Sequence, residues 1–312
     1  MTIAPTRPKR LRRSQLSVPG SSVKMMAKAA TTEADYVFLD LEDAVAPSAK
    51  VPARDSIVHA LRTHDWSRKT RCVRINDLTT EYCHGDILHM VEQAHDVLDT
   101  IIVPKVKTPT DVLWVDIFLT QIEKRLRITR PIGIEVLIEE AEAMINVEAI
   151  ATCTPRLEAL IFGMGDFAAS QGVKSKYIGA EGVLPGGVWQ YHRNKVVIAA
   201  RAAGIEAVDG PFANFKDEAM YRTECERAMV LGCIGKWAIH PSQISIAQEV
   251  FSPLAEDVAR ARKLAAAYEE AEAQGLGSVS VDGVMVDVAS IRIVRNTLEI
   301  ADLIDAKGPK TA

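Results

Sequence analysis

Eight short apolar segments recur along the chain, each followed within a few residues by polar or turn-forming residues. Continuous apolar runs, as opposed to alternating ones, are typical of strands buried on both faces of a parallel sheet. Amphipathic stretches such as Thr108–Leu126 and Trp189–Ala203 separate these segments. The alternation predicts an α/β fold with eight strands, a (β/α)8 TIM barrel. The predicted strands are Leu16–Val18, Tyr36–Leu41, Cys72–Ile75, Thr100–Val103, Gly133–Ile138, Ala159–Phe162, Glu206–Val208 and Lys236–Ile239.

A doubly wound open sheet is the alternative fold. A glycine-rich GxGxxG segment between the first strand and the following helix would favour it. The sequence after Leu16–Val18 has no such segment, so the barrel is the preferred prediction.

The pattern changes after Phe251-Ser252-Pro253. The remaining stretch predicts a helix, a glycine-rich break, a short segment and a last helix, at Leu254–Gln274, Gly275–Gly277, Ser278–Asp287 and about Ser290–Ile304. A tail of roughly 60 residues exceeds what closing a barrel needs. We therefore expect a catalytic barrel domain at residues 1–252 and a C-terminal helical extension at 253–312, which acts as a packing arm or a lid.

Composition narrows the class of protein. The chain has 312 residues, of which 48% are hydrophobic and 25% charged, with a net charge of −4. These values fit a globular protein with a large core and give no reason to expect nucleic-acid or membrane binding. The five cysteines include no CxxC pair, which favours a reduced, cytoplasmic protein. The basic segment from Arg7 to Arg13 is either a solvated tail or a local phosphate site.

Two carboxylates follow neighbouring predicted strands. Glu139 comes directly after Gly133–Ile138, and Asp166 follows Ala159–Phe162 within four residues. The carboxyl ends of barrel strands meet at one face, where the active sites of this fold lie. Two hard oxygen ligands there predict a Mg²⁺ site with open positions. The structural alternatives are a first-turn helix residue for Glu139 and a helix N-cap for Asp166. The adjacent Glu140 could equally be the metal ligand or the helix residue.

Further charged residues follow the other strands. Arg74 lies within an apolar strand, and burying its guanidinium requires an anion partner. That partner is either a substrate carboxylate or a salt bridge to Asp40 or Glu42. Lys105 follows an apolar run and a proline, which suits a Schiff-base lysine. The surrounding carboxylates, including Asp43, argue against a depressed pKa, so we expect Lys105 to support the site without reacting itself.

Several longer strings carry a resemblance to a known family. The chain resembles the CitE-like branch of the HpcH/HpaI aldolase superfamily, and within it the malyl-CoA/β-methylmalyl-CoA lyases. The resemblance covers nearly the whole chain. The matching strings are Arg13–Gly20, Val37–Val45, Val73–Asn76, Val136–Glu139, Asn146–Ala151, Asp209–Phe212, Gly235–Ile244, Glu249–Pro253 and Val286–Ile291.

The resemblance implies a Mg²⁺-dependent carbon–carbon lyase, with Mn²⁺ as a possible substitute. Such an enzyme reversibly cleaves L-malyl-CoA to acetyl-CoA and glyoxylate, or β-methylmalyl-CoA to propionyl-CoA and glyoxylate. It implies Glu139 and Asp166 as metal ligands, and Arg74 as the arginine near the glyoxylate oxygen. It also implies Asp287 as a catalytic aspartate that the C-terminal segment delivers to a neighbouring subunit. The expected active unit is then a homo-oligomer, a trimer or a hexamer.

The resemblance further implies that Arg13, Lys24 and Lys28 contact the phosphates of coenzyme A. The sequence departs from the family at Glu140 and at Ala143, where the family often has threonine and glycine, and in a shorter loop at Lys174–Gly187. Its glycine-rich part is either a connector or an active-site loop. These departures leave citramalyl-CoA lyase, malyl-CoA thioesterase and a citrate lyase β-like subunit with an acyl-carrier partner as alternatives. An inactive CoA-binding regulator is a further alternative of another class.

Overall fold

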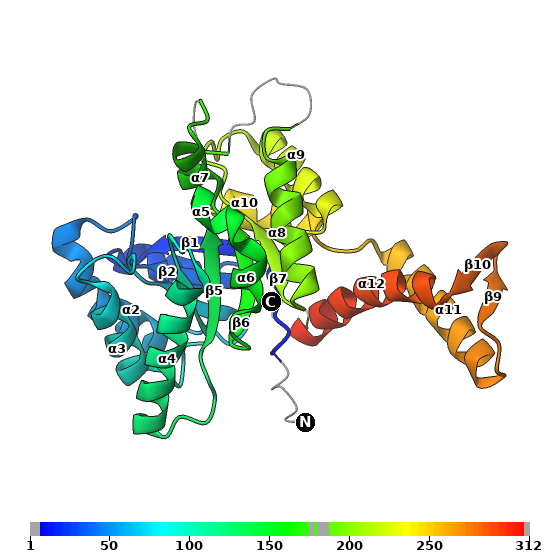
Figure 1. Cartoon of the computed structure of the whole chain (residues 1–312), viewed down its shortest axis with the longest axis horizontal. Helices are drawn as coiled ribbons and strands as arrows, with labels where there is room; N and C mark the ends of the chain where they lie inside the picture. Colours follow the sequence, from blue (N-terminus) through cyan, green and yellow to red (C-terminus); the bar gives the residue numbers. More distant parts are fainter. Residues whose placement is uncertain (1–6, 175–177, 180–186, 309–312) are drawn as a thin grey trace. The chain divides into compact units, whose positions relative to one another are not determined.

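The computed structural model describes residues 7–174, 178–179 and 187–308. Eight parallel strands pair in chain order, and β8 returns to pair with β1 through Ser14 and Lys236, which closes the barrel. All eight predicted strands are present, so the predicted TIM barrel is confirmed. Figure 1 shows helices packed around the strands. The strands are β1 Ser14–Pro19, β2 Tyr36–Asp40, β3 Thr70–Arg74, β4 Thr100–Val103, β5 Gly133–Ile138, β6 Leu157–Phe162, β7 Glu206–Asp209 and β8 Lys236–Ala238.

Helices connect the strands around the barrel. They are α1 Val23–Ala30, the short 3-10 helix η1 Pro47–Ala49, α2 Lys50–Thr63, α3 Cys83–Ala94, α4 Pro109–Leu126, α5 Ala141–Ile145, α6 Val147–Thr152, α7 Met164–Gln171, α8 Gln190–Ala202, α9 Glu218–Leu231 and α10 Ser242–Val250. Helix α4 begins where the sequence predicts. Thr108 is its N-cap, Pro109 starts the helix, and the Asp111 carboxylate accepts a hydrogen bond from the Thr108 N–H at 2.8 Å. This capping box satisfies donors that the first helical turn leaves open.

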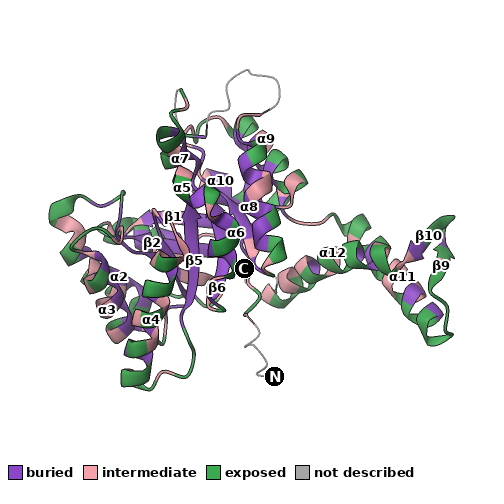
Figure 2. Ribbon diagram, viewed as in Figure 1, coloured by how far each residue is buried: buried purple, intermediate pink, exposed green. Residues whose placement is uncertain are grey.

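The barrel has two apolar layers. One lies between the strands and the surrounding helices, and the other fills the barrel interior with Tyr36, Phe38, Cys72, Ile102, Leu137, Ile161, Val208 and Trp237. Figure 2 shows the strands as the most buried part of the unit, with the helices exposing one face. Both strand faces are therefore buried, which explains the continuous apolar runs in the sequence.

Polar side chains occupy the N-terminal end of the barrel interior. Arg12 is 2% exposed. Its Nε lies 2.9 Å from Oε1 of Glu135, and its Nη2 lies 2.7 Å from Oε2 of Glu158. Gln15 donates to Glu135 and accepts from the indole N–H of Trp237. Arg12 is thus neither a tail residue nor a phosphate ligand, because these ion pairs hold it in the base of the barrel.

The chain divides into two compact units. One comprises Arg12–Phe251 and the residues up to Pro8, and the other comprises Lys9–Leu11 and the residues from Ser252 onward. The second unit contains helix α11 (Ala255–Ala273), strands β9 (Ser278–Val281) and β10 (Val284–Asp287), and helix α12 (Val288–Lys307), around a core of Tyr268, Val281, Val286 and Ile291. Among the described residues, no helix is long and apolar enough to cross a membrane.

The short segment expected at Ser278–Asp287 is an antiparallel hairpin. Asp282 and Gly283 form its turn, with φ of 51° and 78°. Positive φ at both central residues is the signature of the two-residue type I′ turn, which Asp-Gly favours. This turn makes Asp287 the last residue of β10 and the N-cap of α12.

Candidate active site

A network of ion pairs lies at the carboxyl ends of β2 and β3. Arg74, the last residue of β3, binds Asp40 in a bidentate manner, with Nε–Oδ1 of 2.7 Å and Nη2–Oδ2 of 2.6 Å. Its Nη1 lies 2.7 Å from Oε2 of Glu42 and 3.7 Å from Oδ2 of Asp43. Burial alone would lower the pKa of Arg74, but Asp40 and Glu42 outweigh it and raise the pKa. The salt bridge, left open by the sequence, is therefore present, and Arg74 stays cationic.

Lys105 joins this network from the next strand. It follows β4, and its Nζ lies 2.5 Å from Oε1 of Glu42 and 3.3 Å from Oδ1 of Asp43. Burial acts to lower its pKa, but the bond to Glu42 and the charge of Asp43 raise it well above the ordinary value. A Schiff-base lysine needs a depressed pKa. These contacts agree with the supporting role expected for Lys105.

Glu139 is buried at the end of β5 with a carboxylate that is only partly compensated. Its Oε1 accepts a hydrogen bond from the backbone N–H of Lys105 at 2.8 Å. Burial raises the pKa of Glu139 to about 8, and the nearby carboxylates of Glu42 and Asp166 add to the rise, against the opposing charge of Arg74. A carboxylate with a raised pKa in this setting is one whose ionised form a bound cation would stabilise.

Asp166 lies in the first turn of α7, after β6, and is exposed. Its charge contributes to the raised pKa of Glu139, after burial and the charge of Glu42. In the described part of the chain, no group of three or more His, Cys, Asp or Glu side chains could hold a metal. A pair of carboxylates nevertheless fits Mg²⁺, which commonly keeps several waters and takes one or two protein carboxylates plus substrate oxygens.

The structure separates Glu140 from Glu139. Glu140 is the N-cap of α5, and its Oε2 accepts a hydrogen bond from the hydroxyl of Ser170 on α7 at 3.0 Å. The Ser170 hydroxyl also accepts from the N–H of Ala141 at 2.9 Å. Glu140 thus ties two helices together, and Glu139 is the residue whose pKa the charge of Asp166 affects. Most of the loop Lys174–Gly187 lies outside the described residues.

The three expected CoA-binding cations do not share one location. Lys24 and Lys28 lie on exposed positions of α1, one turn apart, directly after the carboxyl end of β1. Arg13 precedes β1 and makes a bidentate pair with Asp35, at 2.7 and 2.8 Å. A six-residue strand is about 20 Å long, so Arg13 lies near the opposite end of the barrel. The structure therefore corrects the expected contact of Arg13 with CoA phosphates.

Asp287 belongs to the C-terminal unit, as the N-cap of α12. Its Oδ1 accepts hydrogen bonds from the backbone N–H of Ser290 at 2.9 Å and from the Ser290 hydroxyl at 3.0 Å. These bonds lower the pKa of Asp287. The cap fixes one carboxylate oxygen against the helix, and Oδ2 has no part in either of these two bonds.

Two residues of the site escaped the sequence reasoning. Gly163, just before α7, has no room for a side chain, because a Cβ there would lie 2.6 Å from Cβ and 2.7 Å from Oε2 of Glu139. Lys50 opens α2 and donates to the carbonyls of Leu41 and Glu42, at 3.0 and 2.7 Å. A lysine at a helix N-terminus opposes the macrodipole, and that mismatch was the available signal. No comparable signal marked Gly163.

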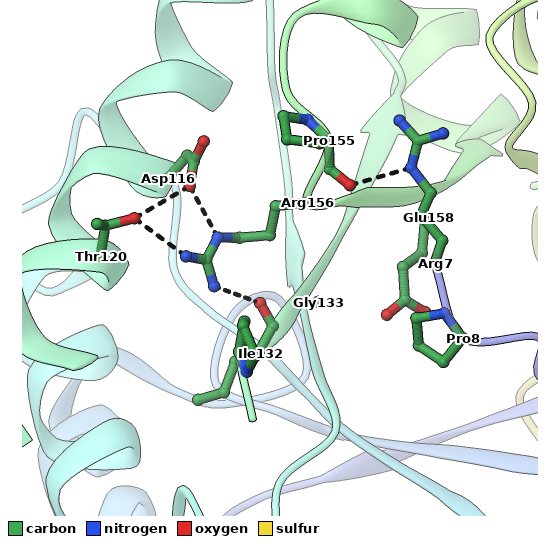
Figure 3. A pocket seen from close by; sticks show the side chains of 10 residues that line it. Arg7, Pro8, Asp116, Thr120, Ile132, Gly133, Pro155, Arg156 and Glu158 are labelled. Carbon is green, nitrogen blue, oxygen red and sulfur yellow. Dashed lines mark hydrogen bonds and ion pairs between the residues drawn. The ribbon is translucent and has the colours of Figure 1, made fainter. Parts of the chain in front are cut away.

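A cavity of about 400 Å³ lies at the other end of β5 and β6 (Figure 3). Arg156 contacts Asp116 at 2.8 Å on one side of it, and Arg7 donates to the carbonyl of Pro155 at 3.0 Å on another. Apart from Arg7 and Pro8 of the basic N-terminal segment, none of the residues that the sequence assigns to a site lines it. The N-terminal face of a TIM barrel is associated with stability, whereas catalysis belongs to the opposite face. This cavity is therefore no candidate for the active site.

An eight-stranded parallel barrel whose strand ends gather acidic and basic side chains defines a TIM-barrel enzyme. The sequence matches the HpcH/HpaI aldolase/citrate lyase family over residues 13–241. That match covers well over half of the chain, and the protein belongs to this family of lyases and aldolases.

Three relatives illustrate the similarity. The chain is 42% identical to an L-malyl-CoA/β-methylmalyl-CoA lyase of Cereibacter sphaeroides, over 97% of this chain and 99% of that protein. It is 36% identical to a (3S)-malyl-CoA thioesterase of the same species, over 95% of this chain and 96% of the relative. A crystal structure of CitE from Mycobacterium tuberculosis in complex with magnesium, acetoacetate and coenzyme A is 27% identical. It has a TM-score of 0.71, with 93% of this chain and 97% of that chain covered.

Proposed function

We propose that this protein reversibly cleaves L-malyl-CoA to acetyl-CoA and glyoxylate, or β-methylmalyl-CoA to propionyl-CoA and glyoxylate. The observation that carries the proposal is the placement of Glu139 and Asp166 beside Arg74 at the carboxyl face of the barrel. The 42% identity to an L-malyl-CoA/β-methylmalyl-CoA lyase over nearly the full length supports it.

Glu139 and Asp166 would hold Mg²⁺, with Mn²⁺ as a substitute. The bound ion would act as a Lewis acid on the glyoxylate carbonyl. The pair fits this ion because Glu139 is buried, offers hard oxygen ligands and lacks full charge compensation.

Arg74 would stabilise negative charge that develops on a substrate oxygen. Its guanidinium has five N–H groups, and the contacts with Asp40 and Glu42 hold it in one orientation. A donor that is fixed before the reaction costs no reorganisation when charge develops. Asp43 lies near both the Arg74 guanidinium and the Lys105 ammonium group, so Asp43 and Lys105 belong to the same network of charges.

Asp287 would exchange the proton at the methyl carbon of the acetyl group. In the condensing direction it takes a C–H proton, the resulting enolate carbon attacks the aldehyde carbon of glyoxylate, and the aldehyde oxygen gains a proton to become the hydroxyl group. Cleavage reverses these changes. The position of Asp287 in the C-terminal unit supports its delivery to a neighbouring subunit of a homo-oligomer. Lys24 and Lys28 would attract the phosphates of coenzyme A.

A thioesterase is the second candidate, favoured by the 36% identical (3S)-malyl-CoA thioesterase. Product analysis separates the two activities. The purified protein is incubated with L-malyl-CoA and Mg²⁺, glyoxylate is trapped as its phenylhydrazone, and free thiol is measured in parallel. A lyase yields glyoxylate without thiol, because the thioester survives in acetyl-CoA. Thiol without glyoxylate would assign thioester hydrolysis and overturn the proposal.

A further inference from the structure

We propose that Lys105 is a positioning residue whose left-handed backbone conformation selects the oxygen of Glu139 that faces the metal. The inference rests on the proposed function in one respect, namely that Glu139 is a metal ligand. It adds a role for a main-chain group on the neighbouring strand end.

The conformation of Lys105 is unusual for its residue type. Its φ is +49°, in the left-handed region that favours glycine, and residues with a Cβ are disfavoured there. The residue follows Pro104 at the end of β4, and in this conformation its N–H donates to Oε1 of Glu139 at 2.8 Å. A disfavoured conformation that persists at a strand end of the catalytic face is a reason to look for function.

The second oxygen of Glu139 points in a different direction. Oε2 lies 2.7 Å from the place that a Cβ at Gly163 would occupy. Gly163 immediately precedes α7, the helix whose first turn holds Asp166. The Lys105 N–H therefore occupies Oε1, while Oε2 lies next to Gly163, three residues before Asp166.

The side chain of Lys105 makes the conformation easier to keep. Its ammonium group is bonded to Glu42 and Asp43, on the loop that follows β2. Contacts at both ends of the residue thus link the ends of β2, β4 and β5. Substitution can separate the effect of the Lys105 backbone conformation on metal binding from the effect of its ammonium charge.

Three variants of Lys105 make that separation. Lys105→Gly and Lys105→Asn lose the ammonium group but accept a positive φ. Lys105→Val also loses the ammonium group, but its branched Cβ resists that conformation. Arg127 supplies the matched control, because it is exposed, has a φ of +57° at the end of α4, and takes no part in the proposed site. Arg127→Val therefore imposes the same kind of strain elsewhere.

Mn²⁺ binding is measured by the loss of the free-ion electron paramagnetic resonance signal, with the melting temperature recorded for each variant. The expected result is that Lys105→Val binds Mn²⁺ at least about fivefold more weakly than Lys105→Gly and Lys105→Asn. Arg127→Val is expected to bind like the unaltered protein. Equal affinity in Lys105→Val and Lys105→Gly would overturn the inference.

The same titration distinguishes failure of the inference from failure of the proposed function. If the unaltered protein binds Mn²⁺ and Glu139→Gln does not, the assignment of Glu139 stands independently of Lys105. If the unaltered protein fails to bind Mn²⁺, or Glu139→Gln binds it equally well, the ligand assignment itself is wrong, and the role of Lys105 is overturned with it.

Discussion

At the scale of single residues, position along a strand separates carboxylates with different roles. Glu135 is the third residue of β5, and Glu139 directly follows its last residue. Glu135 is held by the guanidinium of Arg12 in the base of the barrel, whereas Glu139 accepts a backbone hydrogen bond at the catalytic face. The sequence predicted the position of Glu139 because a strand end is visible as the end of an apolar run. It named Asp40 and Glu42 as alternative partners of Arg74 but could not choose between them and a substrate carboxylate, since that depends on how the side chains meet in the folded barrel.

Arg13 shows the limit of assigning a role from family resemblance. Its family-based assignment concerned the CoA phosphates, but it pairs with Asp35 before the strands begin. Arg13 is only a few residues from the end of β1 in sequence, but an extended strand of that length spans most of the barrel. A resemblance assigns a role to a residue, and the structure then shows whether the side chain lies near enough to the ligand to perform it.

We predict that Asp287→Asn lowers turnover by about 10²- to 10⁴-fold, the range expected when a general acid–base group is lost. Asparagine is as good an N-cap as aspartate, so α12 should stay intact, and Mg²⁺ affinity should remain nearly unchanged because Asp287 is not one of the proposed ligands. The measurements are the rate of L-malyl-CoA cleavage and a Mg²⁺ titration. Loss of metal binding in this variant would contradict the role given to Asp287.

Gly163→Ala tests the close approach of Glu139. The added Cβ would meet Cβ and Oε2 of Glu139 at 2.6 and 2.7 Å, so the carboxylate must move. We predict weaker Mg²⁺ binding and a loss of about 1–3 kcal/mol in the free energy of unfolding, as in other overpacked sites. Gly277→Ala is the matched control, because a Cβ there has no atom within 4 Å. Unchanged metal affinity in Gly163→Ala would show that Glu139 does not depend on this contact.

At the scale of secondary-structure elements, local patterns predicted most of the barrel. The predicted range Thr108–Leu126 corresponds to α4 with its N-cap, and Trp189–Ala203 corresponds to α8 with both of its caps. The β9–β10 hairpin was overlooked, although Asp282-Gly283 between apolar residues is a strong turn signal. A two-stranded hairpin is weak without a helix packed against it, and the contact of Val281 and Val286 with Tyr268 of α11 exists only in the folded unit.

The hairpin turn should matter for catalysis because β10 ends at Asp287. Gly283 has a φ of +78°, so Gly283→Val would strain the turn and disturb the start of α12. We predict a loss of turnover of at least about tenfold, with Mg²⁺ affinity preserved. Steady-state kinetics and a metal titration measure the two effects. Wild-type turnover in Gly283→Val would show that the hairpin does not hold Asp287 in place.

At the scale of the whole molecule, buried ion pairs join barrel strands to helices. Asp209 at the end of β7 contacts Arg193 of α8 and Lys236 of β8, and Arg193 also contacts Glu224 of α9. Breaking one partner of such a buried set costs about 3–5 kcal/mol. The sequence predicted the barrel from periodicity. These cross-links could not be predicted, because their residues are distant along the chain and meet only in the folded state.

This network predicts the direction of acid sensitivity. Burial alone would raise the pKa of Asp209, but Arg193 and Lys236 outweigh it and lower the pKa. The stabilisation is therefore complete above the unfolded-state pKa of about 3.9 and is lost as the pH falls below it. We predict a melting temperature that does not respond to Asp209 between pH 8 and about pH 5 and falls at lower pH.

Asp209→Asn provides the comparison. It should lower the melting temperature at neutral pH and flatten the decline at acidic pH, because the titrating group is gone. Differential scanning calorimetry at a series of pH values measures both effects. An equally steep acid decline in Asp209→Asn would assign the acid sensitivity to other carboxylates.

The most direct test of the central claim is the metal dependence of glyoxylate release from L-malyl-CoA. The unaltered protein and Glu139→Gln are assayed with Mg²⁺, with a chelator, and after Mg²⁺ is restored. The account predicts release by the unaltered protein that stops with the chelator and returns with Mg²⁺, and little release by Glu139→Gln under any condition. Glyoxylate release that is insensitive to the chelator, or that survives in Glu139→Gln, would contradict it.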